Sequence, residues 1–198
     1  MRADQPSTIV AALWPQATAA SARLARFAAL AIAGTIALTL SARAQIPFYP
    51  VPLTLQTLVV LMLGAAYGGR LAAATVALYL VEGALGLPVF AGTPEKGIGL
   101  AYMMGPTGGF LVGFLVAAAF VGFCAERGWD RSVLKLLGVM AIGHAIIFAF
   151  GLGWLAAIIG WSKAWIGGAE PFVIATLVKT LLAAAIVPAL WRVLPRKS

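Results

Sequence analysis

Long runs of apolar residues alternate along the chain with short segments that are polar or rich in glycine and proline. A helix that crosses a membrane needs about 20 mainly apolar residues. The runs are long enough for that purpose, and little sequence remains between them. The pattern therefore predicts an all-α membrane protein with six transmembrane helices, at residues 24–40, 53–68, 71–85, 106–125, 136–159 and 171–191.

The connecting segments differ in character. Residues 45–52 hold three prolines within six positions, which interior helix does not tolerate, so we expect an extended connection at the interface. The sequence from Gly68 to Arg70 predicts a tight turn, and the glycine- and proline-rich residues 86–105 predict a long irregular stretch. Pro106 suits the first turn of the fourth helix.

The N-terminal region is small and polar and includes two prolines. We expect residues 1–22 to form a cytoplasmic tail or a short surface helix, and residues 23–194 to form the six-helix transmembrane domain. A second interpretation takes two arginines, the apolar run 27–40 and the Ala-Arg-Ala triplet at 42–44 as a cleavable secretory signal. That signal would have an unusually long charged region and would carry Arg43 inside its cleavage site, so a retained helix is favoured.

Composition supports a membrane protein without an extramembrane domain. The chain is 62% hydrophobic and 10% charged, with a mean hydropathy of +0.99, whereas globular domains are about 45–50% apolar and about 25% charged. The net charge of +8 could indicate nucleic-acid binding. The charges lie at the ends of the apolar runs, where they orient a membrane protein, so we expect a lipid bilayer and no nucleic acid as partner.

Missing motifs narrow the function further. The sequence has no Gly-x4-Gly-Lys-Ser/Thr motif for ATP hydrolysis and no interpretable pair of carboxylates or Ser-His-Asp set, so we expect no enzyme. The single histidine, His144, and the single cysteine, Cys124, have no second ligand at metal-binding spacing. We therefore expect no metal, no cofactor and no disulfide.

The distribution of lysine and arginine predicts the orientation. With the N-terminus in the cytoplasm, ten of these residues fall at cytoplasmic ends and three at outer ends, and Lys179 is left within a helix. The bias favours an even number of spans, both termini inside and a place in the cytoplasmic (inner) membrane. Segments 45–52, 86–107 and 161–170 then all face outward, where irregular backbone favours a small-molecule pocket that opens outward.

Lys179 is the polar residue that the membrane should most strongly exclude. It lies about eight residues, or about 12 Å, into the sixth predicted helix, where a lysine costs about 2.5–3.5 kcal/mol unless it is paired. We interpret it as a ligand-binding residue or one member of a buried pair. Thr176 lies one turn away on the same helix face.

Two further polar side chains fall in the outer half of the predicted bundle. Gln56 lies one turn into the second helix and can both donate and accept hydrogen bonds. Glu82, in the third helix, is interpreted either as a pocket residue or as an interfacial partner of Lys163 or Lys96. Because one cavity could collect these groups with those of the sixth helix, they are candidates for a single site.

The first predicted helix carries a stripe of alanines with a spacing of four, which lets another helix approach closely. A membrane partner is the expected consequence. The stripe consists of Ala25, Ala29, Ala33 and Ala37.

Several motifs in order resemble the BioY family, the biotin-specific substrate-binding components of energy-coupling-factor (ECF) transporters. They are Pro-Val-Pro-Leu-Thr-Leu-Gln-Thr at 50–57, Tyr-Leu-x-x-Gly-x-x-Gly-x-Pro-Val-Phe-Ala-Gly at 79–92, Gly-Pro-Thr-Gly-Gly-Phe at 105–110, and Pro171-Phe172 followed by Lys179. The resemblance extends from about residue 25 to 190.

The resemblance implies a six-helix protein that captures biotin from outside and associates with a coupling transmembrane subunit and a pair of ATPases, which fits the missing nucleotide-binding motif. The alanine stripe looks like the family's contact surface for the coupling subunit. Many relatives carry an aspartate at the position of Thr176, so the group that completes hydrogen bonding to the ureido ring differs here.

The resemblance and the polar inventory together suggest how biotin is bound. We expect Lys179, Thr176, Gln56 and Glu82 to form the polar end of the site, and Tyr79 and Phe90 to pack on the bicycle. The turn from Gly105 to Gly109, with Thr107 and Gly108, is the expected carboxylate site at a helix N-terminus, and residues 86–107 are the candidate lid. A carrier of another vitamin or small carboxylate, or a membrane assembly protein without a ligand, are the alternatives.

Overall fold

The computed structural model describes residues 7–15 and 18–194, so residues 1–6, 16 and 17 of the predicted tail lie outside the described residues. Helix α1 (Ile9–Leu13) begins this part of the chain. The Thr8 side chain caps α1 by accepting a hydrogen bond from the Ala11 amide. Ile9 and Val10 are buried and α1 packs against α3, so of the two expectations for this region, a tail or a short helix, residues 9–13 form a helix.

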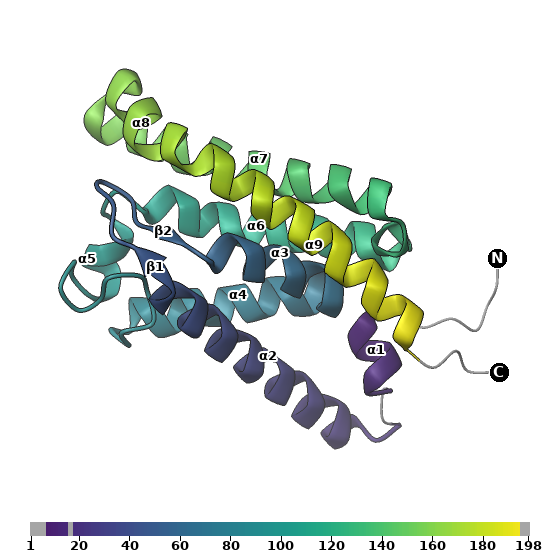
Figure 1. Ribbon diagram of the computed structural model, residues 1–198. Helices are drawn as coiled ribbons and strands as arrows, with labels where there is room; N and C mark the ends of the chain where they lie inside the picture. Colours follow the sequence, from purple (N-terminus) through teal and green to yellow (C-terminus); the bar gives the residue numbers. More distant parts are fainter. Residues whose placement is uncertain (1–6, 16–17, 195–198) are drawn as a thin grey trace.

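A helix occupies each of the six predicted apolar segments. These helices are α2 (Ala20–Arg43), α3 (Gln56–Tyr67), α4 (Gly69–Ala84), α6 (Gly108–Glu126), α7 (Val133–Ile159) and α9 (Val173–Val193). They run roughly along one axis and form the elongated bundle of Figure 1. The prediction of an all-α fold is therefore confirmed.

The helices differ in their capacity to span a bilayer. Among the described residues, four segments are long and apolar enough, namely Ala20–Arg43, Gly108–Glu126, Val133–Ile159 and Trp161–Val193. The 12 residues of α3 and the 16 residues of α4 reach only about 18 and 24 Å, less than a hydrocarbon core of about 30 Å. The protein is thus a multi-pass helical membrane protein, and the count of six spans stays a prediction.

The predicted turn between α3 and α4 is confirmed and is as short as one residue. Gly68 adopts a φ of 83°, a conformation that side-chain-bearing residues rarely adopt. Helix α6 lies against this turn, because a Cβ atom on Gly122 would lie 2.4 Å from the backbone of both Gly68 and Gly69. Helix α6 also packs against α3, α4 and α7, so it forms the centre of the bundle.

The three elaborate connections gather at one end of the bundle, and α1 lies at the opposite end (Figure 1). The expected extended connection forms a two-stranded antiparallel pair, β1 (Gln45–Ile46) with β2 (Leu53–Thr54). Pairing of Leu53 with Ile46 is the reason that α3 begins at Gln56 and not at the predicted residue 53. The irregular stretch contains a short helix, α5 (Gly99–Met103).

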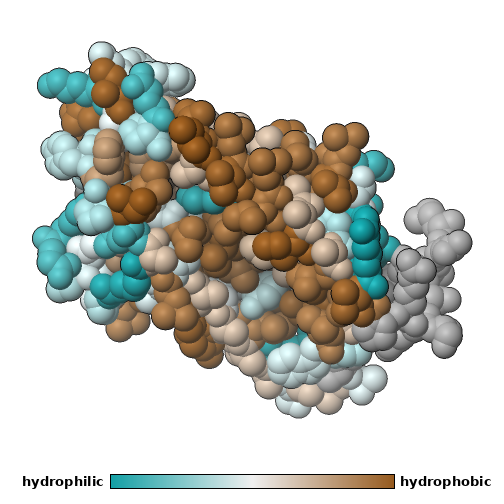
Figure 2. Space-filling model, viewed as in Figure 1, coloured by the Kyte–Doolittle hydropathy of each residue, from teal (hydrophilic) through white to brown (hydrophobic). Residues whose placement is uncertain are grey.

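The segment between α7 and α9 is largely helical, whereas an irregular connection was expected at residues 161–170. Helix α8 (Trp161–Gly168) is followed by a 3-10 turn, η2 (Glu170–Phe172). Trp161 and Trp165 are exposed on α8, as expected for aromatic residues at a membrane interface. Figure 2 shows hydrophobic residues over the middle of the bundle and hydrophilic residues toward its two ends, the distribution that a bilayer imposes.

A buried carboxylate connects neighbouring elements at the end of the bundle near α1. Asp130 lies in η1 (Trp129–Arg131), between α6 and α7, and is fully buried. The indole N–H of Trp191 on α9 donates a hydrogen bond to its carboxylate. The Arg131 guanidinium lies 4.6 Å from the centre of the same indole ring. These contacts join the α6–α7 connection to the last turns of α9.

This acid predicts a pH dependence of stability. Burial raises the pKa of the Asp130 carboxyl above its ordinary value of 3.8, against smaller opposing effects of Trp191 and Arg131. The folded state therefore binds the proton more tightly than the unfolded state, and stability falls as the pH rises from about 4 upward. Asp130→Asn retains an oxygen acceptor for Trp191 and removes the charge, so its thermal midpoint in detergent should fall less between pH 4 and pH 7. Glu95→Gln, at an exposed carboxylate, is the control, and equal slopes for Asp130→Asn and the parent protein would contradict the prediction.

Candidate functional site

A pocket lies inside the bundle, close to the end that carries the elaborate connections. It encloses about 40 Å³ and is bounded by the β2–α3 junction, the α5–α6 segment, α7 and α9. Its apolar wall consists of Val51, Pro52, Ala91, Phe110, Leu111, Phe114, Ile147, Phe148 and Phe172. Its polar wall consists of Thr54, Gln56, Thr57, Tyr102, Thr107, Thr176 and Lys179.

Lys179 dominates one end of the pocket. The side chain is only 5% exposed, and its ammonium donates to the Thr54 carbonyl at 2.6 Å and to the Thr57 hydroxyl at 3.1 Å. These hydrogen bonds join α9 to the start of α3. Within the described chain Lys179 forms no ion pair, so the buried-pair interpretation is replaced by a cation held by neutral oxygens.

Two more polar groups complete this end. Gln56 is 4% exposed, and its side-chain amide donates to the Tyr79 hydroxyl at 2.7 Å. Thr176 also lines the pocket and lies one turn before Lys179 on α9. The end therefore offers both hydrogen-bond donors and acceptors to a ligand.

The opposite end of the pocket is formed by the start of α6. Thr107 stands at the N-cap position of α6, and Tyr102 lies beside it on α5. The Tyr102 hydroxyl donates to the Ala91 carbonyl at 2.8 Å, and burial raises the pKa of this phenol, which keeps it neutral. The first amides of a 19-residue helix also bring partial positive charge to this end.

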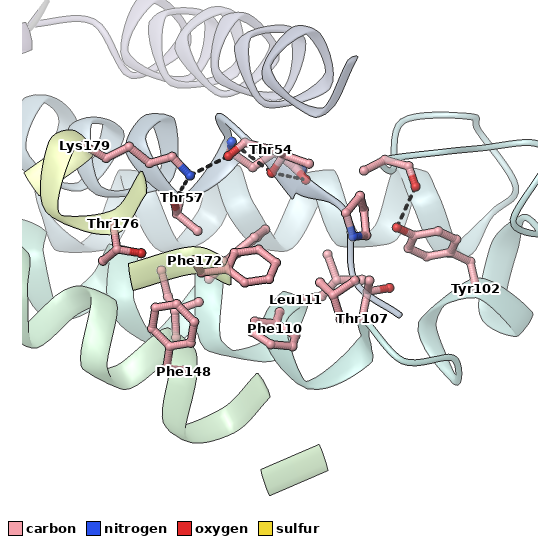
Figure 3. Close-up of a pocket in the computed structure, with 16 residues that line it drawn as sticks. Thr54, Thr57, Tyr102, Thr107, Phe110, Leu111, Phe148, Phe172, Thr176 and Lys179 are labelled. Atoms are coloured by element: carbon pink, nitrogen blue, oxygen red, sulfur yellow. Dashed lines mark hydrogen bonds between the residues drawn. The ribbon is translucent and has the colours of Figure 1, made fainter. Parts of the chain in front are cut away.

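Aromatic rings separate the two polar ends. Phe148 lies edge-on to both Phe110 and Phe172, with ring centres 6.2 Å apart in each pair. Figure 3 shows these rings in the middle of the pocket, with Lys179 at one end and Tyr102 at the other. The arrangement suits an elongated ligand that is polar at its two ends and apolar between them.

Four of the predicted ligand-binding residues line the pocket, namely Gln56, Thr107, Thr176 and Lys179. Tyr79 and Phe90 lie behind the wall, because the Tyr79 hydroxyl accepts from Gln56 and the Phe90 ring stacks on Tyr102 with centres 5.0 Å apart. They contact residues of the pocket wall without lining the pocket themselves.

The remaining predicted residues lie outside the pocket wall. The Gly105 carbonyl accepts a hydrogen bond from the Trp154 indole at 2.9 Å. Gly108 packs against the Met103 carbonyl, where a Cβ atom would find no room. Glu82 lies half-buried on α4, and within the described chain it forms no ion pair, so the expected partners Lys163 and Lys96 are not in contact with it.

The backbone of the candidate lid, residues 86–107, accepts hydrogen bonds from side chains of three helices, α2, α4 and α5. Arg43, the last residue of α2, donates to the Pro88 carbonyl at 2.6 Å and to the Thr93 carbonyl at 2.9 Å. Between them, the Val89 carbonyl accepts from Tyr79 at 2.9 Å, and the Ala91 carbonyl accepts from Tyr102. Since Ala91, Tyr102 and Thr107 line the pocket, this stretch closes one side of it.

Sequence reasoning missed several wall residues. Thr54 and Thr57 flank Gln56 in the motif at 50–57, which could have pointed to them. Tyr102 lies in the predicted irregular stretch, and Phe114, Ile147 and Phe148 lie in apolar runs where they do not stand out. No group of metal-ligating side chains occurs in the described ranges 7–15 and 18–194.

Comparison with known proteins identifies the family. A family model described as "BioY family" matches residues 13–196. A probable biotin transporter BioY of Pyrococcus horikoshii is 37% identical over 152 residues, which cover 76% of this chain and 88% of the relative. A biotin transporter BioY of Rhizobium etli is 36% identical over 165 residues, which cover 79% of this chain and 86% of the relative.

The fold also matches a solved structure, the crystal structure of the S-component for biotin from an ECF-type ABC transporter. The TM-score is 0.74 at 23% sequence identity, and the match covers 89% of this chain and 95% of the other. The family match over nearly the whole chain, the similarity to full-length relatives and the shared helical fold agree, and the chain belongs to the BioY family.

Proposed function

We propose that this protein captures biotin as the substrate-binding (S) component of an ECF-type transporter. The relatives described above are named biotin transporters, and the protein whose fold matches is an S-component for biotin. The protein is then a transport component and not an enzyme, and biotin is its transported ligand, with no cofactor.

The observation that carries the proposal is the order of chemistry along the pocket. Biotin has a ureido group with donors and an acceptor at one end, an apolar bicycle and chain in the middle, and a carboxylate at the other end. Lys179, with Gln56 and Thr176, fits the ureido group, and the phenylalanine rings fit the bicycle. Thr107 and the start of α6 fit the carboxylate.

Capture requires the pocket to enlarge. Its volume of about 40 Å³ is well below the roughly 300–1,000 Å³ of pockets that enclose small molecules. Lys179 must exchange its hydrogen bonds to Thr54 and Thr57 for bonds to the ligand, and the aromatic side chains must move apart. The ligand then replaces partners that the buried ammonium already has, which limits the cost of desolvation.

The same proposal includes the orientation of the chain. Six spans with both termini in the cytoplasm place the β1–β2 pair, the candidate lid and α8 outside, in agreement with the excess of lysine and arginine at the α1 end. The pocket then opens to the outside of the cytoplasmic membrane. A coupling transmembrane subunit and ATPase subunits supply the energy that this chain lacks.

Equilibrium binding of labelled biotin to the purified chain in detergent tests the function. We expect saturable binding of one biotin per chain, with competition by desthiobiotin and none by unrelated vitamins. Selective binding of another vitamin or small carboxylate would show that this compound, and not biotin, is the substrate. An absence of saturable binding to any member of the panel by folded protein would favour an assembly role.

The alanine stripe predicts the site of partner docking. Ala25, Ala29 and Ala33 are exposed on α2, and Ala37 is partly exposed. Ala33→Trp places a bulky ring where a close helix contact is expected. Co-purification with the coupling subunit should fall about tenfold or more, while biotin binding by the isolated chain should be unchanged. Ala145→Trp, at an exposed alanine of α7, is the matched control, and equal losses in the two variants would remove the stripe as the docking surface.

A further inference from the structure

A second cavity lies at the α1 end of the bundle, far from the candidate substrate pocket. It encloses about 270 Å³ between α1, the first turns of α2 and α4, and the last turn of α6. Arg26, Arg70, Thr8, Tyr67 and Glu126 belong to its wall. The Tyr67 hydroxyl already donates to the Leu30 carbonyl, and the Thr8 hydroxyl accepts from the Ala11 amide. The two arginines are therefore the groups of the wall that could bind an anion.

The two arginines differ in whether their guanidinium groups already have hydrogen-bond partners in the protein. Arg26 is held by α1, because its guanidinium donates to the Trp14 carbonyl at 2.9 Å and to the Val10 carbonyl at 3.3 Å. Arg70 is exposed, and within the described part of the chain it forms no hydrogen bond or ion pair. Its guanidinium thus remains available to an external anion.

The acid in the wall does not neutralise this arginine. One oxygen of Glu126 accepts the Gly69 backbone N–H at 2.9 Å, at the first turn of α4. The Glu126 carboxylate therefore stabilises the N-terminus of α4. Two arginines against one glutamate leave an excess of positive charge in the cavity wall.

The cavity borders the lipid-facing surface. Phe27 belongs to its wall and is 40% exposed, and the neighbouring Leu24 is 70% exposed on α2. Helix α2 continues from this end along the edge of the bundle (Figure 1) and exposes large apolar side chains on the way. An anion bound in the cavity would therefore lie at headgroup depth, with apolar helix surface beside it for acyl chains.

We propose that this cavity binds the phosphate group of an anionic phospholipid, with Arg70 as its principal ligand and Arg26 as the preorganised second cation. Guanidinium groups form paired, charge-assisted hydrogen bonds with phosphate. A free phosphate ester shares this chemistry, but the apolar surface of α2 next to the cavity favours a lipid. The proposal does not depend on which substrate the other pocket binds.

Native mass spectrometry of the full chain tests the site. The protein is titrated with phosphatidylglycerol and with phosphatidylcholine of identical acyl chains, and the affinity for each lipid is measured in the parent and in two variants. Arg70→Gln should weaken phosphatidylglycerol binding about tenfold, the loss of one charge-assisted contact. Arg127→Gln removes a charge at the same end of the bundle, where Arg127 only caps its own helix, and should change the affinity by less than about twofold.

Three results would overturn the proposal. Equal binding of the two lipids by the parent would show that the headgroup charge is not recognised. Equal losses in Arg70→Gln and Arg127→Gln would show that only overall charge matters. Displacement of phosphatidylglycerol by glycerol 3-phosphate at similar concentrations would show that the site recognises a soluble phosphate and not a lipid. Unchanged thermal stability of Arg70→Gln confirms that the variant is folded.

Discussion

Lys179→Met should reduce the affinity for biotin by about a hundredfold or more. The ammonium is nearly fully buried at one end of the candidate pocket, where its hydrogen bonds are not weakened by competition with water. A ligand that enters the variant pocket leaves a polar group facing a thioether, and such an unmade buried hydrogen bond is costly. Methionine keeps the length of the side chain, so the shape of the pocket is retained.

Two measurements separate a binding role from a structural one. In the parent, saturating biotin should raise the thermal midpoint, because a ligand that binds only the folded state stabilises it. The variant should keep a midpoint near that of the parent without biotin, because the loss of the hydrogen bonds to Thr54 and Thr57 is offset by the removal of a buried charge that has no acidic partner in the described chain. It should lose the shift that biotin causes. Lys163→Met, at an exposed lysine of α8, is the control for lost charge. A folded Lys179→Met protein with parental affinity would falsify the assignment of Lys179.

The sequence was informative where a residue conflicts with its surroundings. A lysine within an apolar run is costly in a membrane, and Lys179 does line the pocket together with Thr176 and Gln56. Phe114 and Phe148 could not be singled out, because an aromatic residue in such a run packs equally well against lipid or a neighbouring helix. Their place on the wall depends on how α6 and α7 rotate against each other, which tertiary packing decides.

The predicted boundary of a helix was wrong where pairing with a distant segment overrides the local hydrophobic pattern. The predicted second helix begins at residue 53, yet pairing of Leu53 with Ile46 and of Thr54 with Gln45 holds residues 53 and 54 in extended conformation. Glu82 was grouped with the polar end on the basis of its depth alone, whereas the structure places it outside the pocket wall. Depth along a helix follows from the sequence, but the direction in which a side chain points does not.

Gly122→Ala should lower the free energy of unfolding by about 3 kcal/mol. The added Cβ would lie 2.4 Å from the Gly68 carbonyl carbon and from the Gly69 nitrogen, and 2.6 Å from the Gly69 Cα. All of these are backbone atoms, so no side chain can rotate away to make room. The one-residue turn and α6 must therefore separate, which opens the contact at the centre of the bundle.

A glycine-to-alanine substitution at a position with free space around it should instead raise the free energy of unfolding. A Cβ atom on Gly138, in α7, meets nothing within 4 Å, and alanine is favoured over glycine in a helix by about 0.5–1 kcal/mol. Denaturant-induced unfolding in detergent measures both variants against the parent. Gly122→Ala should also lower the amount of biotin-binding protein without changing the affinity of the folded fraction, because Gly122 lies outside the pocket wall. A Gly122→Ala protein as stable as Gly138→Ala would show that α6 and the turn can separate at little cost, and that the close approach does not hold the bundle together.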